Sequence, residues 1–161
     1  MKTETAIKKY QHEDVWSPVS VEARHEKSYS ANDMIDAYFK GKNAQYEENQ
    51  KIIKNLIEEN LDHSQKVCEE FCDLLKQNGF KCSFVTFRII DPFNFDAIFA
   101  VSKESFLADN FNEAYRMARE MRKKITTKIF NFTFIFMPLT DSLDTEKLLS
   151  DGYIMKYEPK P

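Results

Sequence analysis

Three aspartates near the ends of predicted strands are the residues whose type and place suit metal binding or acid–base chemistry. Asp91 and Asp96 flank a turn between two strands, and Asp141 follows a third strand. Each also has a structural interpretation, in which the carboxylate caps a turn or points away from its strand. No frame of nucleophile and base accompanies them, and with three glycines the chain has little room for a glycine-rich phosphate loop. We therefore predict no catalytic residue, no cofactor and a protein that is not an enzyme.

The residues around Asp96 resemble one strand of the nucleotidyltransferase fold. In residues 94–101, the sequence Asn-Phe-Asp leads into the apolar run Ala-Ile-Phe-Ala-Val. Members of that family carry Asp-x-Asp at this place, where the two aspartates hold Mg²⁺ for phosphoryl transfer. The resemblance implies that Asp96 is a Mg²⁺ ligand. Asn94 stands at the first ligand position, however, and Asp-Pro-Phe replaces the Gly-Ser turn of the family.

Six lysines and arginines with one glutamate occupy residues 116–128, a local charge of +5 in a chain of net charge −3. At helical spacing Arg116, Arg119 and Lys123 share one face, which makes them candidates for binding phosphate or another anion. A helix C-terminus also attracts cations through its dipole, and this explains the same cluster without a ligand. Because the whole chain is acidic, we do not expect nucleic acid as its partner.

Cys68 and Cys72 lie four residues apart in a predicted helix, so their sulfurs share one face, and Cys82 begins the next strand. One such spacing is typical of structural zinc sites, but no second pair of ligands follows it. Free cysteines are also common as small buried side chains. We therefore predict three reduced, metal-free thiols, and the odd number of cysteines fits a reducing cytoplasm.

Alternating apolar residues predict a β-hairpin over residues 82–101, with its turn at Pro92. In residues 103–125 the apolar side chains recur at steps of three and four, which predicts an amphipathic helix that covers the sheet, with a second segment starting near Asp109. Residues 129–137 carry Phe at every second position, which predicts a central strand. A strand–helix–strand crossover makes the last two strands parallel. The predicted fold class is therefore α+β, a small mixed sheet with helices on one face.

An apolar stripe from about residue 44 to 78 predicts one helix of about 35 residues, or about 50 Å. The alternative is two helices that break near Asp62, because average helices are far shorter. A small sheet cannot cover the whole stripe, so we expect its surplus to meet a partner or a second copy through Ile53, Leu56 and Ile57. This segment contains eight acidic and four basic residues. Its net negative charge would attract the basic helix, within the fold or across two copies.

Residues 1–30 are polar and lack periodicity, which predicts an arm that is partly ordered at most, followed by one domain over residues 31–161. The exception is Val15–Val21. It is either a short edge strand, since Pro18 excludes a central one, or part of an arm that docks through Trp16. If it joins the sheet, the order of elements approaches a ferredoxin-like β-α-β-β-α-β.

These patterns favour a non-enzymatic binding or regulatory protein that acts through protein–protein contacts or self-association. The alternative is a divergent nucleotidyltransferase-like or nucleotide-binding domain that uses Asp96 and the basic helix. No apolar run approaches the roughly 18 residues of a membrane span, and the first residues lack the apolar region of a signal peptide. We therefore expect a soluble cytoplasmic protein without membrane contact.

Overall fold

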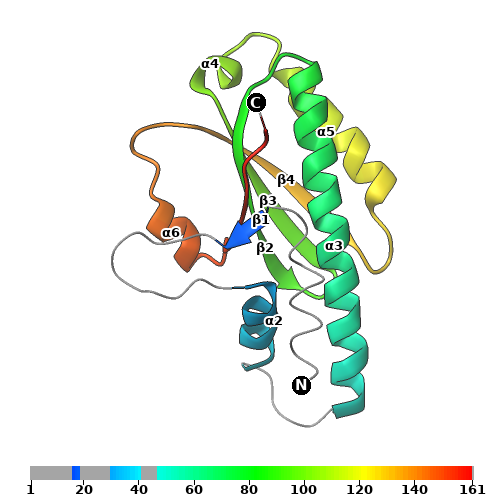
Figure 1. Ribbon diagram of the computed structural model, residues 1–161. Coiled ribbons are helices and arrows are strands. Elements are labelled where there is room, and N and C mark those ends of the chain that lie inside the picture. The colour runs from blue at the N-terminus through cyan, green and yellow to red at the C-terminus, as the bar shows by residue number, and fades with distance from the viewer. Residues whose placement is uncertain (1–15, 19–29, 41–46, 161) are drawn as a thin grey trace.

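The computed structural model describes residues 16–18, 30–40 and 47–160 of the chain (Figure 1). They form a five-stranded mixed sheet in the order β1-β5-β2-β3-β4 with helices packed against it. The predicted α+β class is confirmed. Within the described ranges, no helix is long and apolar enough to cross a membrane.

The predicted hairpin is confirmed as β2 (Cys82–Asp91) and β3 (Asn94–Val101), which are antiparallel. The predicted third strand is β4 (Asn131–Pro138), and it lies parallel to β3 with Asn94 opposite Asn131 and Val101 opposite Pro138. Parallel neighbours need a crossover, and here the crossover contains two helices. The sheet is therefore mixed, as its sequence pattern predicted.

The predicted helix over residues 103–125 is divided into α4 (Lys103–Phe106) and α5 (Asn112–Ile125). The Ser102 side chain caps the start of α4 by accepting a hydrogen bond from the Ser105 backbone. Between the two helices Phe111 is buried and packs against Phe80, Phe106 and Phe136. The chain turns because this aromatic side chain enters the core ahead of the α5 stripe.

The long predicted helix is a single helix, α3 (Glu47–Gln77), with no break near Asp62. The helix is followed by a turn at Gly79, whose positive φ of 82° is a conformation that glycine adopts without strain. Phe71 lies at the centre of the core, where its ring packs against Phe99, Phe134 and Phe136. Helices α3 and α5 cover the same face of the sheet (Figure 1).

The last part of the chain closes the other edge of the sheet. After α6 (Thr145–Ser150) comes β5 (Met155–Tyr157), which pairs with β2, and β1 (Trp16–Pro18) pairs with β5 at the edge. The edge-strand interpretation is therefore confirmed for Trp16–Pro18, and the rest of Val15–Val21 lies outside the described residues. Helix α6 lies on the side of the sheet opposite α3, so helices flank both faces rather than the one we predicted (Figure 1). The ferredoxin-like arrangement stays a prediction.

The α2 helix (Ala31–Lys40) begins where the sequence indicates, directly after Ser30. The Ser30 hydroxyl accepts from the Asp33 backbone, and the Asp33 carboxylate accepts from the Ser30 backbone. This is a reciprocal cap with aspartate in the place of the more usual glutamate. The side chain of Ile35 is fully buried, and Ala31 belongs to the hydrophobic core cluster, so α2 packs against the rest of the domain through its first turn.

Candidate functional site

The carboxylate of Asp91 is engaged in hydrogen bonds within the hairpin turn. Its Oδ1 accepts hydrogen bonds from the backbone N–H groups of Phe93 and Asn94, at 2.8 and 3.0 Å, and its Oδ2 accepts from the Asn94 side chain at 2.7 Å. Asn94 in turn accepts from the side chain of Asn131 on β4. These contacts make Asp91 and Asn94 parts of a turn that joins three strands, because their polar atoms satisfy one another.

Asp96 lies on β3 opposite Arg88 of β2, on the face of the sheet turned away from α3. Its Oδ2 accepts from Arg88 Nη2 at 3.0 Å and from Nε at 3.3 Å, and its side chain is only 11% exposed. Arg88 also donates to the Asp151 carbonyl and stacks over the Tyr153 ring. The partner of Asp96 is thus a guanidinium that also holds the α6–β5 connection.

Asp141 lies at the other end of the sheet. Because β3 and β4 are parallel, Asp96 lies beside Thr133, and the five residues from there to Pro138 span about 16 Å. Asp141 is exposed beyond Pro138. The three aspartates therefore do not share one site, and no group of three histidines, cysteines or acids in the described part of the chain is placed to hold a metal ion.

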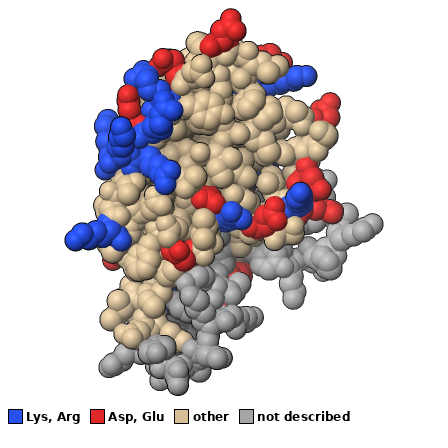
Figure 2. Space-filling model, turned by 180° about the vertical axis from the view of Figure 1, so that it is seen from behind, with Lys and Arg blue, Asp and Glu red and all other residues tan. Residues whose placement is uncertain are grey.

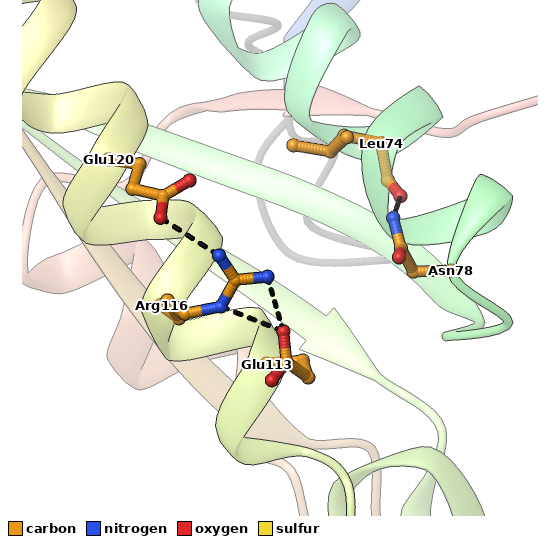
Figure 3. Close-up of polar contacts among 5 residues, drawn as sticks. All are labelled: Leu74, Asn78, Glu113, Arg116 and Glu120. Atoms are coloured by element: carbon orange, nitrogen blue, oxygen red, sulfur yellow. Dashed lines mark hydrogen bonds and ion pairs between the residues drawn. The ribbon is translucent and has the colours of Figure 1, made fainter.

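The exposed side of α5 carries the positive charge that the sequence predicted. Figure 2 shows lysine and arginine side chains gathered along the flank where α5 lies. Arg116 is held between Glu113 and Glu120, with N–O distances of 2.6 and 2.9 Å (Figure 3). The hydrogen bond that Arg116 donates to the Glu113 carboxylate raises the pKa of Arg116, which is charged in any case. Of the three predicted anion-binding residues, Arg116 is thus already paired, while Arg119 and Lys123 are exposed.

Five further bases lie on α5 and on the loop that follows it, and we call this group the basic face. Among the described residues, the side-chain hydrogen bond made by this group is the one that Arg122 donates to Asn131 Oδ1. The carboxylates of Glu113 and Glu120 on α5 pair with Arg116 and not with these bases. The set is exposed and continues past the helix end. The basic face consists of Arg119, Arg122, Lys123, Lys124 and Lys128.

An exposed apolar surface follows the basic face directly. Ile129 is 51% exposed, and on the neighbouring hairpin Phe93 is 43% and Ile90 is 49% exposed. The Phe93 carbonyl accepts from the Asn131 backbone at 2.7 Å, so the hairpin and the α5–β4 loop are neighbours. We call these three residues the apolar end. Sequence periodicity did not single them out, because their exposure follows from where the turn and loop meet.

Asn60 of α3 positions the apolar end. Its side chain is buried and donates to the Pro92 carbonyl at 2.8 Å and to the Ile129 carbonyl at 2.7 Å. One amide group therefore holds both the hairpin turn and the α5–β4 loop against α3. In the sequence Asn60 is one polar member of an apolar stripe, and that pattern does not reveal which carbonyls it meets.

Comparison with family models, with curated proteins and with solved structures finds no match. The assignment of any site therefore rests on the contacts described above and on those that follow.

The residues predicted at a helix interface are more buried than the stripe alone suggested. Ile57 is fully buried, whereas Ile53 and Leu56 are partly exposed. The exposed neighbour on this part of α3 is Ile52. Trp16 lies in β1 with its backbone opposite Tyr157, and its side chain is outside the described part of the structure.

A groove of about 870 Å³ lies where the end of α3 meets the start of β2 and the end of the chain. Cys72 and Cys82 line it, and their sulfurs are 3.9 Å apart. The described cysteines, Cys68 included, are free thiols. Burial raises the pKa of Cys68, and the hydrogen bond to Cys82 together with burial raises that of Cys72. Burial also raises the pKa of Tyr157, another lining residue, to about 12.

Proposed function

We propose that this protein is a non-enzymatic binding protein, which holds an acidic protein partner on the basic face and the adjoining apolar end. The observation that carries the proposal is that the uncompensated charge of α5 runs directly into exposed Ile129, and that a backbone hydrogen bond from Asn131 to the Phe93 carbonyl brings the hairpin turn next to this loop. The proposal also places the protein in the cytoplasm, where free thiols stay reduced.

The basic face supplies attraction and orientation. Its charges lie on the last turns of α5 and the loop behind it, whereas the chain as a whole has a net charge of −3. A surface of one sign speeds the approach of an opposite one and suppresses wrong partners. The dipole of α5 stabilises these cations in the free protein, so no ligand is needed to keep the surface folded.

The apolar end supplies the part of the contact that excludes water. Ile90, Phe93 and Ile129 are large side chains that a partner would bury, and burial is worth about 25 cal/mol per Å² of apolar surface. Asn60 fixes the two loops that carry Phe93 and Ile129, so the surface is ordered before it binds. A preformed surface loses less conformational entropy on association.

A protein suits this surface better than a nucleic acid does. Protein–DNA interfaces are far more positive and polar, and surfaces that bind single strands use aromatic rings on which bases stack. Here two of the three exposed apolar residues are isoleucines, and Glu113 and Glu120 lie on the same helix as the basic face. An acidic segment with an apolar anchor satisfies both halves of the surface.

The test is affinity capture from a cell extract with the wild-type chain and with the double variant Arg119→Glu/Lys123→Glu, followed by calorimetry with each purified captured protein. We expect an acidic protein that the wild type binds and the variant binds at least tenfold more weakly, with affinity that falls as salt rises. The variant Ile129→Ser should weaken binding without changing the salt dependence.

The matched control is Lys103→Glu/Lys147→Glu, which makes the same change of charge at exposed positions outside the basic face. It should bind as the wild type does. Equal loss in both double variants would mean that only net charge matters and would refute a defined surface. If the chain bound a single-stranded oligonucleotide more tightly than any captured protein, nucleic acid would replace the acidic protein as the partner. If the chain captured only itself, the partner would be a second copy.

A further inference from the structure

Cys72 and Cys82 form a close pair of thiols at a groove that the proposed partner surface does not use. The Cys72 thiol donates a hydrogen bond to the Cys82 sulfur, with 3.9 Å between the two sulfur atoms. We propose that this pair is a redox-active dithiol, which closes to an intramolecular disulfide by exchange with a low-molecular-weight peptide disulfide that binds in the groove. This inference is independent of the proposed function.

The two cysteines belong to neighbouring elements that a short connection joins. Cys72 lies in the last part of α3, and Cys82 is the first residue of β2. A disulfide needs its sulfurs about 2.0 Å apart, so the two must approach by about 2 Å. The strand is irregular at this point, because the register shifts between Cys82 and Phe84. Local adjustment at the end of β2 is therefore sufficient, and the core around Phe71 can stay in place.

The two thiols differ in how accessible they are to dissolved molecules. Cys72 is 3% exposed, whereas Cys82 is partly exposed at the groove. A dissolved disulfide therefore meets Cys82 first. The hydrogen bond that Cys72 donates to the Cys82 sulfur helps to keep Cys72 protonated, together with burial. A disulfide sulfur is a weaker acceptor than a thiolate, so this hydrogen bond weakens once Cys82 is bonded to another group. Cys72 is then the neighbouring thiol that completes the reaction.

The exchange balances in two steps. The Cys82 thiolate attacks one sulfur of the small disulfide, a mixed disulfide forms, and the first small thiolate leaves. The Cys72 thiolate then attacks the Cys82 sulfur, the protein disulfide forms, and the second small thiolate leaves. The two cysteines are oxidised, the small disulfide is reduced to two thiols, and the two protons lost by the cysteines pass to them.

The groove has the size and charge for such a molecule. Its volume of about 870 Å³ lies within the usual range for small-ligand sites. Lys76, Lys81 and Lys160 line it and can pair with the carboxylates of a peptide disulfide, and Asp73, which also lines it, can pair with an amino group. A soft metal is a poorer fit, since among the residues the structure describes no third ligand is placed to complete a site.

Oxidised glutathione is the probe, added to the folded full chain. We expect the wild type to lose two of its three free thiols, to release two glutathione molecules per chain, and to give a peptide in which Cys72 is linked to Cys82. Dithiothreitol should restore all three thiols. The variant Cys72→Ala should instead accumulate one glutathionyl group on Cys82, and Cys82→Ala should not react while folded.

The control is Cys68→Ala, which removes the fully buried third cysteine and should react as the wild type does. Tryptic cleavage after Lys81 separates Cys82 from the other two cysteines, and cleavage after Glu69 or Glu70 with a glutamate-specific protease separates Cys68 from Cys72. Mass spectrometry of the double digest therefore identifies the bond. A link from Cys82 to Cys68, a wild type that stops at the mixed disulfide, or a folded wild type that keeps all three thiols would each overturn the proposal. The wild-type measurement decides even if a variant fails to fold.

Discussion

Replacing Asn60 by alanine tests the arrangement of the proposed partner surface, because one buried amide holds both of its loops. The change removes the donors to the Pro92 and Ile129 carbonyls. The Pro92 bond is buried, and a buried carbonyl left without a donor costs about 1–3 kcal/mol. The Ile129 bond is partly buried, so water replaces some of it and the cost is about 1 kcal/mol. We expect the free energy of unfolding to fall by about 2–4 kcal/mol.

Asn78 provides a matched control. Its side-chain amide donates to the Leu74 carbonyl at 2.8 Å, but this bond is exposed at the end of α3 (Figure 3). Water takes over an exposed bond, and Asn78→Ala should change the free energy of unfolding by no more than about 0.5 kcal/mol. Urea unfolding with an unchanged m-value should therefore show a midpoint about 1–2 M lower for Asn60→Ala alone, with m taken as about 2 kcal/mol per M.

A second variant separates the hydrogen bonds from the loss of volume. In Asn60→Asp the shape is retained, but a carboxylate oxygen faces the two carbonyl oxygens and only its protonated form can donate. Burial beside two carbonyl oxygens raises the pKa of the introduced carboxyl in the folded state above its ordinary value of about 4. The destabilisation should be large near neutral pH, should shrink as the pH falls through that raised pKa, and should be smallest below about 4. If Asn60→Ala and Asn78→Ala lose the same stability, or if Asn60→Asp shows no such pH dependence, the amide does not hold these loops.

Two further predictions concern Asp96 and Tyr157. Asp96→Asn should lower the free energy of unfolding by about 1–2 kcal/mol, because it leaves the Arg88 guanidinium without its carboxylate. Mg²⁺ should affect neither protein, and a gain with Mg²⁺ in the wild type alone would restore the metal interpretation. The raised pKa of Tyr157, about 12 against an ordinary 10, means that the folded chain holds this proton more tightly. The stabilisation is complete below pH 10 and is lost as the pH rises toward 12, by about 2 kcal/mol. Tyr157→Phe should flatten the alkaline decline in urea melts, and an unchanged slope would contradict the assignment.

Periodicity predicted the elements of this fold because most of them bury one face. Phe at every second position predicted β4, and the apolar stripe of residues 44–78 favoured one helix over two that break near Asp62; the structure shows the strand and the single helix. The sequence predicted a second segment near Asp109 within residues 103–125, but the place where α5 begins, at Asn112, was less accessible. It depends on Phe111 entering an aromatic cluster whose members come from distant parts of the chain. No local pattern states that such a cluster has room for one more ring.

The partner of Asp96 depends on the register in which β2 pairs with β3, and the sequence pattern leaves this register open. If β2 and β3 paired regularly from Asp91 opposite Asn94, Arg88 would lie opposite Ala97. The register instead shifts between Ile89 and Asp91, and Asp96 comes to lie opposite Arg88. One residue of shift thus converts a carboxylate that resembles a Mg²⁺ ligand into half of an ion pair, since period two makes every register step change the partner of each side chain. The same reasoning applies at Asn60 and at Cys72, whose partners lie on other elements and were set by packing rather than by spacing along the chain. Function in this protein therefore has to be sought where elements meet, at the two loops that Asn60 holds and at the groove beside Cys82.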